Sequence, residues 1–192
     1  MVSKDNPRPA GAGERRIKLP LTREIREELR AGDRLLLEGR VITARDQVHR
    51  RVLGALERGE TLPFQLEGRI VFYAGPSPAP EGKQAGSVGP TTASRMDPYT
   101  PALAARGVAA FIGKGPRSPE VRRALREHGV LYLVAVGGAA ALLGSKVRSM
   151  RVIAYPELGP EAVYELEVAG FPVIVACDLR GGNVFSHLEG GS

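Results

Sequence analysis

The sequence predicts a single α/β domain. The chain has 192 residues, enough for one hydrophobic core of moderate size, and 43% of them are hydrophobic. Short apolar runs alternate with segments of helical periodicity, and Gly or Pro residues separate the two kinds of segment. This alternation is typical of α/β proteins. With 25% charged residues, the composition is that of an ordinary soluble globular protein.

The two ends of the chain are predicted to lie outside this domain. Residues 1–16 are rich in Pro, Gly and charge and have no periodic apolar face, so we expect a flexible N-terminal arm. The folded domain is expected over 17–183, with a C-terminal tail over 184–192. No apolar run approaches the roughly 20 residues of a membrane helix, and the polar start lacks the order of a signal peptide. We therefore expect a cytoplasmic protein without a membrane partner.

The first half of the domain contains two predicted strands with a helix between them. One strand is expected over 34–43, with a turn or bulge at Glu38-Gly39. The helix follows over 46–58, because apolar residues recur at every fourth position from Val48 to Leu56. The second strand covers 69–73, where the sequence reads RIVFY.

The middle of the chain combines a long loop, a buried strand and a second helix. The loop is predicted over 74–90, a length that is usually functional or disordered. The strand covers 108–112 and ends in Gly113-Lys114-Gly115. Ser118 and Pro119 begin the helix as its N-cap and first helical residue.

The last third of the chain is predicted to return to the sheet. One strand covers 130–136, and 137–142 form a tight turn into a short helix. Three further strands are expected over 147–154, 162–168 and 173–177, where short apolar runs are bounded by Gly, Pro or polar residues.

Charge and cysteine content narrow the possible functions. The formal net charge of +6 suggests an anionic partner. The chain has no Trp and only 5% aromatic residues, so it lacks the side chains that stack on bases, and a small anion is favoured over nucleic acid. One cysteine, Cys177, excludes an intrachain disulfide and a thiolate-ligated metal centre built by this chain alone.

Three clusters of polar residues could carry chemistry, and the first is Arg45 with His49. If the helix has begun, these residues project from one face, where the Arg could grip a carboxylate while the imidazole moves a proton. The alternative is that Asp46 caps the helix and the basic residues over 45–51 form a solvated face. The physics of these residues alone favours the alternative.

The second and third clusters follow predicted strands. In 86–98, which reads GSVGPTTASRMDP, glycines let backbone amides approach a ligand, hydroxyls offer donors, and Arg95 offers a bidentate fork for an anion. A flexible surface loop is an equal alternative for this segment. Lys114 emerges between two glycines at the end of a buried strand, where ligands bind in open α/β sheets, although most lysines in such turns are merely solvated.

Six segments together resemble the β subunit, equivalently the C-terminal domain, of the class I iron–sulfur fumarases and their tartrate dehydratase relatives. The segments are ARDQVHRR (44–51), RIVFYAGP (69–76), GSVGPTTASRMDPYTP (86–101), FIGKG (111–115), LYLVAVGGAAAL (131–142) and ELGPEAVYELEVAGFPVIV (157–175). The combination of GPTT-x-x-RMD with a following GKG is specific. The resemblance runs from about residue 19 to residue 183.

The resemblance implies a swivelling β/β/α type of α/β fold with a mixed sheet. It also implies a heteromer, an α2β2 complex, in which a separate α subunit carries a [4Fe-4S] cluster on three cysteines and this chain alone binds none. The single cysteine agrees with that division. On this resemblance, 17–183 is a catalytic domain that completes a site shared with the α subunit.

Carried over by motif, the resemblance assigns substrate-binding roles to three cations. Arg45 and Arg95 match arginines that hold carboxylates, and Lys114 matches the lysine of GKG that also holds substrate. Three cations suit a dicarboxylate, because separate grips on its ends fix which face of the double bond meets water. Thr92 and Gly89, from the same glycine- and threonine-rich motif, are expected to contact the substrate as well.

Two residues are assigned catalytic roles by the resemblance. Thr91 matches the threonine that moves the proton of the substrate C–H bond, and His49 matches the histidine of the RDxxH motif. An unassisted Thr hydroxyl is a poor base, so Thr91 needs a neighbouring base or a strong positive potential.

The expected reaction is the reversible hydration of fumarate to (S)-malate, a hydro-lyase step of the tricarboxylic acid cycle, because RMD-PYTP and VGGAAAL resemble the fumarase branch more. Dehydration of L-tartrate or another hydroxy-dicarboxylate is the alternative, and a non-catalytic dicarboxylate-binding regulatory module is an alternative of another class. One departure is GKGPRSPE (113–120), where many relatives continue GKG with another glycine and a methionine.

Overall fold

Seven strands form one mixed sheet in the part of the chain that the structure, a computed structural model, describes: residues 13–82, 85–135 and 140–188. The strands are β1 (Arg15–Lys18), β2 (Arg34–Thr43), β3 (Ile70–Phe72), β4 (Ala110–Gly113), β5 (Leu131–Val134), β6 (Val147–Ala154) and β7 (Val163–Cys177). None of the helices among these residues has the length and apolar character needed to cross a membrane.

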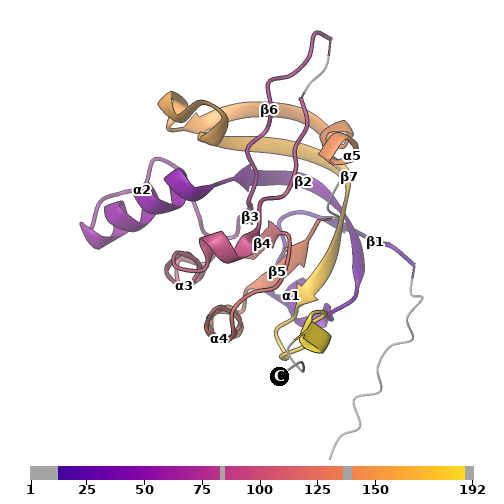
Figure 1. Cartoon of the computed structure of the whole chain (residues 1–192). Coiled ribbons are helices and arrows are strands. Elements are labelled where there is room, and N and C mark those ends of the chain that lie inside the picture. The colour runs from indigo at the N-terminus through magenta and orange to yellow at the C-terminus, as the bar shows by residue number, and fades with distance from the viewer. Residues whose placement is uncertain (1–12, 83–84, 136–139, 189–192) are drawn as a thin grey trace, which may run out of the picture.

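The sheet closes on itself because β2 has partners on both edges. Along one edge β2 pairs in parallel first with β1 and then with β3, and along the other it pairs antiparallel with β7. The parallel pairing continues through β4 to β5, and β5 pairs with β7. The strands β2, β3, β4, β5 and β7 therefore form a barrel, with β1 and β6 attached to it (Figure 1). The predicted α/β fold of the swivelling β/β/α type is confirmed.

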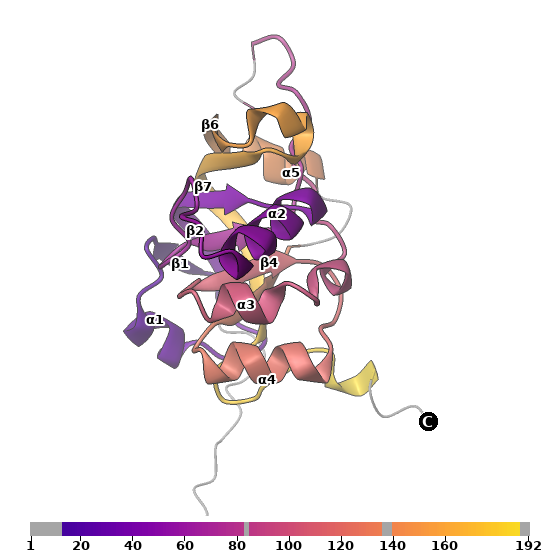
Figure 2. The same ribbon diagram turned by 90° about the vertical axis from the view of Figure 1, so that its left-hand side faces the viewer.

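Apolar residues of the strands serve two separate cores. Ile70 and Phe72 of β3 point into the barrel, whereas Val71 and Tyr73 point to a second core outside it, as the two-residue period of a strand requires. Within the barrel the Phe72 and Phe171 rings meet edge to face, with centroids 5.5 Å apart. Helices on one side of the sheet cover the outer core (Figure 2).

The helices begin and end close to where the sequence predicts. The two longest are α2 (Asp46–Glu57) and α4 (Pro119–Glu127), and Ser118 caps α4 by accepting a hydrogen bond from the Val121 amide at 3.2 Å. The others are α1 (Arg23–Glu28), α3 (Thr100–Ala104) and α5 (Ala140–Ser145), with 3-10 helices η1 (Ala93–Met96), η2 (Pro156–Glu161) and η3 (Ser186–Leu188). β1, α1, η1, α3, η2 and η3 have no counterpart in the predicted elements.

Both boundaries of the folded domain lie beyond the predicted 17–183. β1 begins at Arg15, two residues inside the segment predicted as an arm, and residues 1–12 lie outside the described part of the chain. At the other end the Val184 amide donates to the Ala176 carbonyl at 3.0 Å, and Phe185 contacts the outer core. The predicted turn over 137–139 also lies outside the described residues.

The strands predicted over 162–168 and 173–177 are one continuous strand, β7, so this prediction is wrong. Residues 169–172 separate the two predicted strands. In the structure Leu37 pairs with Phe171 and Glu38 with Ala169, so Gly170 is the extra residue of a β-bulge. Its φ of +66° bends the strand without ending it. The irregularity predicted at Glu38-Gly39 is the opposite side of this bulge.

Gly39 is expected to be among the least replaceable residues of the barrel. It has a φ of +127°, and an added Cβ would lie 2.9 Å from the Leu19 Cβ. Gly39→Ala should therefore lower the free energy of unfolding by about 2 to 4 kcal/mol, from backbone strain and steric overlap together. Denaturant unfolding of both proteins measures the difference.

Gly170→Ala is the matched control, because its φ is also positive but no atom lies within 4 Å of the added Cβ. It should cost only the backbone term, about 1 kcal/mol. Equal losses in the two variants would show that the contact with Leu19 contributes nothing.

Candidate functional site

The predicted site residues converge where the parallel strands β2, β3 and β4 end. The segment carrying Thr91 runs across these ends, with the Thr91 amide donating to the Tyr73 carbonyl at 2.6 Å. The Thr91 carbonyl accepts from the Lys114 amide at 3.3 Å, and Thr92 forms a parallel bridge with Lys114. The backbone thus places both threonines between the end of β3 and the end of β4. The structure thus brings the backbones of Thr91 and Lys114, two of the predicted site residues, into contact.

Arg45 lies in the junction between β2 and α2, beside η2. Its Nε is 3.6 Å from Glu161 Oε1, an ion pair that is about three-quarters shielded from solvent. Gly75 leaves room for the side chain, since an added Cβ there would lie 3.1 Å from the arginine Nη1. Arg45 Nε and Glu161 Oε2 are buried without a hydrogen-bond partner. Buried polar groups are rarely left so, and these atoms therefore mark an incomplete polar site.

Arg95 lies on η1 and reaches the first turn of α2. Its Nη2 donates to Asp46 Oδ2 at 2.7 Å, and half of the side chain is exposed to solvent. Asp46 therefore pairs with Arg95, while the N-cap position of α2 belongs to Arg45, which makes no side-chain cap. A guanidinium has five N–H donors in a planar fork, so one bond to Asp46 leaves donors for a second carboxylate.

Lys114 is exposed at the end of β4. The two glycines that flank it are each required, but for different structural reasons. An added Cβ at Gly113 would lie 2.9 Å from Tyr73 Cδ2 and 3.0 Å from Ala93 Cβ, so only glycine permits this packing. Gly115 has a φ of +80°. Within the described residues the Lys114 ammonium has no ion-pair or hydrogen-bond partner. It is therefore available to an anion.

His49 lies in the outer core, with none of its surface exposed. Its Nδ1 lies 2.8 Å from the Arg45 carbonyl oxygen, to which it donates, and its ring contacts the rings of Tyr73 and Tyr99. Burial lowers the pKa of His49 to about 4, and the nearby positive charge of Arg117 adds to the lowering. The four-residue spacing therefore brings the imidazole to the backbone of Arg45. His49 is buried, so it is not part of the solvated basic face that the alternative interpretation predicted over 45–51.

Gly89 lies in the loop that separates β3 from η1. The loop protrudes from the barrel (Figure 1), and its two arms are joined where the Ser77 amide donates to the Ser87 carbonyl at 3.0 Å. Gly89 is half-buried, and an added Cβ there would lie 3.2 Å from Ala140 Cβ. The glycine therefore permits close contact between the loop and α5, two residues before Thr91.

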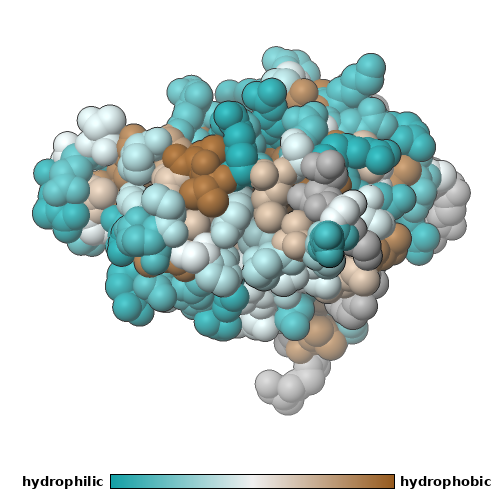
Figure 3. All heavy atoms as spheres, turned by 90° about the horizontal axis from the view of Figure 1, so that it is seen from above, coloured by the Kyte–Doolittle hydropathy of each residue, from teal (hydrophilic) through white to brown (hydrophobic). Residues whose placement is uncertain are grey.

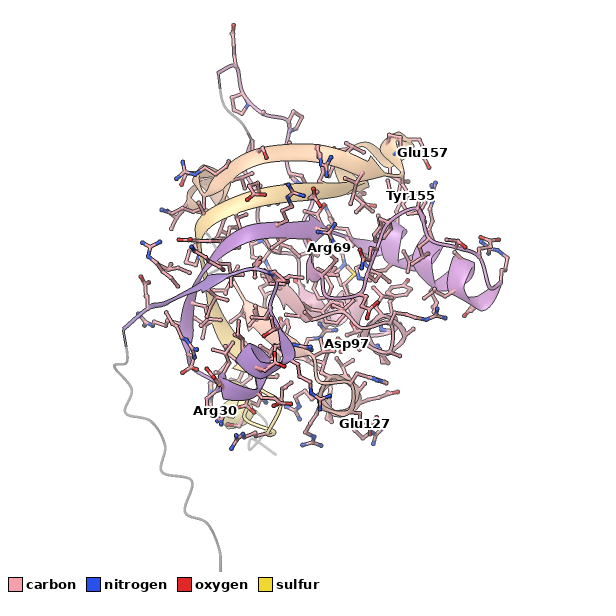
Figure 4. All side chains as sticks on the ribbon, turned by 180° about the vertical axis from the view of Figure 1, so that it is seen from behind. Arg30, Arg69, Asp97, Glu127, Tyr155 and Glu157 are labelled. Carbon is pink, nitrogen blue, oxygen red and sulfur yellow. The ribbon has the colours of Figure 1, made fainter. Side chains whose placement is uncertain are left out.

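A buried charged network beside the site was not predicted. The Arg117 side chain is fully buried, and its Nε donates to Asp97 Oδ1 at 2.8 Å. It also donates to the Tyr73 hydroxyl at 3.0 Å and to Thr100, and it lies over the rings of Tyr73 and Tyr132. Figure 4 shows Asp97 between α2 and the end of the molecule where Glu127 lies. The only signal for it was the departure GKGPRSPE, which contains this arginine.

The described residues do not fit a metal cluster held by this chain. They contain no group of three or more His, Cys, Asp or Glu side chains placed to hold a metal ion. Cys177, the one cysteine of the sequence, is buried at the end of β7, and its Sγ faces the Asn183 side chain.

The end of the molecule that carries β6 and α5 is largely hydrophilic. Figure 3 looks onto this end and shows hydrophilic residues around smaller hydrophobic patches. Leu142 of α5 and Val152 of β6 are large hydrophobic residues exposed there.

The sequence is similar to a family of known proteins. The family described as Fumarase C-terminus matches residues 3–188. The chain is 38% identical over 190 residues to the aerobic class I fumarate hydratase of Escherichia coli K12, covering 95% of this chain and 34% of that protein. It is also 38% identical over 175 residues to the putative L(+)-tartrate dehydratase subunit beta of Methanocaldococcus jannaschii, covering 88% of this chain and 90% of that protein.

A third relative, fumarate hydratase 2 of Leishmania major, is 38% identical over 175 residues, which cover 88% of this chain and 31% of that protein. The chain thus spans about a third of the fumarate hydratases it matches and most of the tartrate dehydratase subunit. With nearly the whole sequence matched and the predicted fold in place, the chain belongs to the fumarase C-terminus family.

Proposed function

We propose that this chain is the beta subunit of an iron–sulfur hydro-lyase that reversibly hydrates fumarate to (S)-malate. The observation that carries the proposal is that the segments bearing Arg45, Thr91, Arg95 and Lys114 meet where three parallel strands end, joined by the backbone bonds of Thr91 and Lys114 and by the Arg95–Asp46 bond. These side chains match the two needs of the reaction. A dicarboxylate must be held at both ends, and a proton must be moved at the carbon between them.

The carboxylate grips are provided by cations that already have oriented partners. Asp46 accepts a hydrogen bond from Arg95, and Glu161 forms an ion pair with Arg45, so both guanidinium groups are oriented before a ligand binds. Each arginine retains unused N–H donors, and Lys114 adds an exposed ammonium. The three cations outnumber the two resident carboxylates, Asp46 and Glu161, so the free site carries a net positive charge that attracts the dianion. Separate cations can then hold the two ends of the substrate. Thr92, exposed beside Lys114, and Gly89, in the loop before Thr91, are further substrate contacts in this proposal.

Thr91 is the proposed proton-transfer residue. The hydrogen bonds of its backbone to Tyr73 and Lys114 fix its position at the strand ends. The positive charges of Arg95 and Lys114 favour the ionised form of a nearby hydroxyl, because opposite charge stabilises the deprotonated state. This potential supplies part of the assistance that a threonine needs to accept a proton from carbon.

The proposal requires a partner that carries the [4Fe-4S] cluster, because one buried cysteine cannot ligate it. When bound, the open iron of such a cluster supplies Lewis-acid chemistry to the hydroxyl or water. We place the cluster on an α subunit, in an α2β2 complex within the cytoplasm. The coverage of 90% of a protein named as a subunit beta supports a separate chain of this kind.

Dehydration of L-tartrate is the second candidate. It is favoured by the same relative, whose printed name is a putative L(+)-tartrate dehydratase subunit and whose length this chain nearly spans. The residues that hold two carboxylates serve either substrate, so the choice depends on groups near the central carbons. A non-catalytic dicarboxylate-binding module is the alternative of another class, and it predicts binding without turnover.

Arg95→Gln tests the proposed grip in the enzyme formed with the cluster-bearing chain under anaerobic conditions. Loss of a charge-assisted bond to the substrate should lower kcat/KM for fumarate by roughly 10- to 100-fold. The loss of fumarate is followed by its ultraviolet absorbance, and tartrate is assayed in parallel.

Arg50→Gln is the matched control, because Arg50 is an exposed arginine of α2 outside the site, and it should leave kcat/KM unchanged. A wild-type complex that binds fumarate and tartrate but turns over neither would refute the enzyme and leave the binding module. Unchanged kinetics in Arg95→Gln would refute the grip.

The complete burial of His49 favours a positioning role over direct proton transfer, and the catalytic role stays a prediction. The imidazole supports the Arg45 carbonyl and must remain neutral to do so in the core. With a folded-state pKa of about 4 and an unfolded value of about 6.5, the unfolded chain binds more protons between these pH values. Stability is therefore retained above about pH 6.5 and falls as the pH drops toward 4.

Denaturant unfolding at pH 6.5 and pH 5 should show a loss of about 2 kcal/mol from this residue. The double variant His128→Gln/His187→Gln should keep the loss, because both of these histidines are exposed. His49→Gln should remove it. A pH dependence that persists in His49→Gln would contradict the assignment.

A further inference from the structure

Arg117 lies in the segment that follows Lys114, and its guanidinium bonds to the segment that follows Arg95. Asp97 follows Arg95 by two residues, and Arg117 follows Lys114 by three. The Arg117–Asp97 ion pair therefore joins the segment after Arg95 to the segment after Lys114. Asp97 adds a second tie, since its Oδ2 accepts from the Ser118 amide at 3.2 Å. Both carboxylate oxygens of Asp97 are thus used to hold the two segments together.

The same network also reaches the backbone around Thr91. Tyr73, whose hydroxyl accepts from Arg117, accepts the Thr91 amide at its carbonyl. Tyr132, whose ring lies 5.1 Å from the guanidinium carbon, donates its hydroxyl to the Gly115 carbonyl at 2.8 Å. Every segment of the proposed site is therefore in contact with this buried cation or with a side chain that contacts it, and the segment carrying Arg45 is reached through His49, whose ring contacts that of Tyr73.

The burial of this cation makes the arrangement rigid. A guanidinium without water must satisfy its donors within the protein, and here Asp97, Thr100 and the Tyr73 hydroxyl accept them. Moving one segment relative to the other would break bonds that no solvent can replace. Arg95 and Lys114 themselves are exposed, so the constraint acts on their backbones and leaves their ends free to meet a ligand.

We propose that Arg117 and Asp97 are a positioning pair that fixes the separation of Arg95 and Lys114 and thereby selects the length of the bound dicarboxylate. The proposal rests on the proposed function, in which these cations grip carboxylates. A ligand held at one end needs no fixed separation, whereas a ligand held at both ends fits only one chain length well. Loss of the pair should therefore weaken discrimination between lengths more than it weakens the binding of a single carboxylate.

The first measurement uses this chain alone and does not depend on its activity. Arg117→Lys keeps the charge but loses the planar fork, and Arg123→Gln is the control because Arg123 is exposed on the same helix, α4. Hydrogen exchange is followed at the Lys114 and Ala93 amides, which bond between the two segments. Arg117→Lys should raise exchange there by roughly 10-fold or more relative to the amides of the β2–β7 ladder. An equal rise at all amides would refute the local constraint.

The second measurement uses the active complex. Malonate, succinate and glutarate, which are saturated dicarboxylates of increasing length, are compared as inhibitors, with butyrate as a ligand of one carboxylate. In Arg117→Lys the preference for succinate over the other two should shrink by roughly 10-fold, while inhibition by butyrate stays within about twofold. Asp97→Asn should behave in the same direction, and Arg123→Gln should match the wild type.

The outcomes separate this proposal from the proposed function. If all three dicarboxylates weaken by the same factor in Arg117→Lys, the pair is merely structural and the proposal is overturned, although the enzyme assignment stands. If the wild-type complex neither turns over nor binds a dicarboxylate, the proposed function fails, and the selection of length fails with it. Hydrogen exchange then still reports whether the pair constrains the two segments.

Discussion

The antiparallel pairing of β2 with β7 is the constraint on which the rest of the structure depends. It closes the parallel strands β2 to β5 into a ring, so that their ends are held at fixed neighbouring positions. An open sheet would leave the register of its edge strands less well determined. The closed ring also excludes water from the inner core, and the strands can present Tyr73 and Phe111 to a second core under the helices. The site is built on the rim of this ring, and every cation proposed to bind substrate is attached to it by a short segment.

Much of this architecture could be predicted from the sequence, because strands and long helices have a local signature. The period of four in α2 and the Ser-Pro start of α4 specify these helices without tertiary information. β7 could not be predicted as one strand, since a bulge at Gly170 is visible only through its pairing with β2. β1 and α1 are too short to show periodicity, and their place depends on contacts with distant segments.

The candidate site shows the same division between local and distant information. The residue types and motifs of Arg45, Thr91, Arg95 and Lys114 identify them as ligand-binding candidates, and the structure explains why the glycines beside Lys114 are needed. The burial of His49 could not be predicted, because the sequence of α2 does not show whether the face that carries this basic residue points to solvent or to the core. Arg117 was missed because arginine is ordinarily a surface residue, and its partners lie on segments distant in the chain. Ion pairs inside a core leave no periodic pattern in a sequence.

The carboxylates already paired with Arg45 and Arg95 have a consequence for the ionic strength dependence of binding. Glu161 and Asp46 act as counter-ions in the free chain, so a dianion bound as we propose would join or replace an existing partner. Few mobile salt ions are then released when the substrate enters, and affinity should fall less steeply with salt than three bare cations would imply. Because Arg45 and Arg95 are already paired with carboxylates, this cluster of cations should bind unrelated anions only weakly. Selectivity then depends on geometry, since a ligand has to present its charges where the resident carboxylates leave donors open.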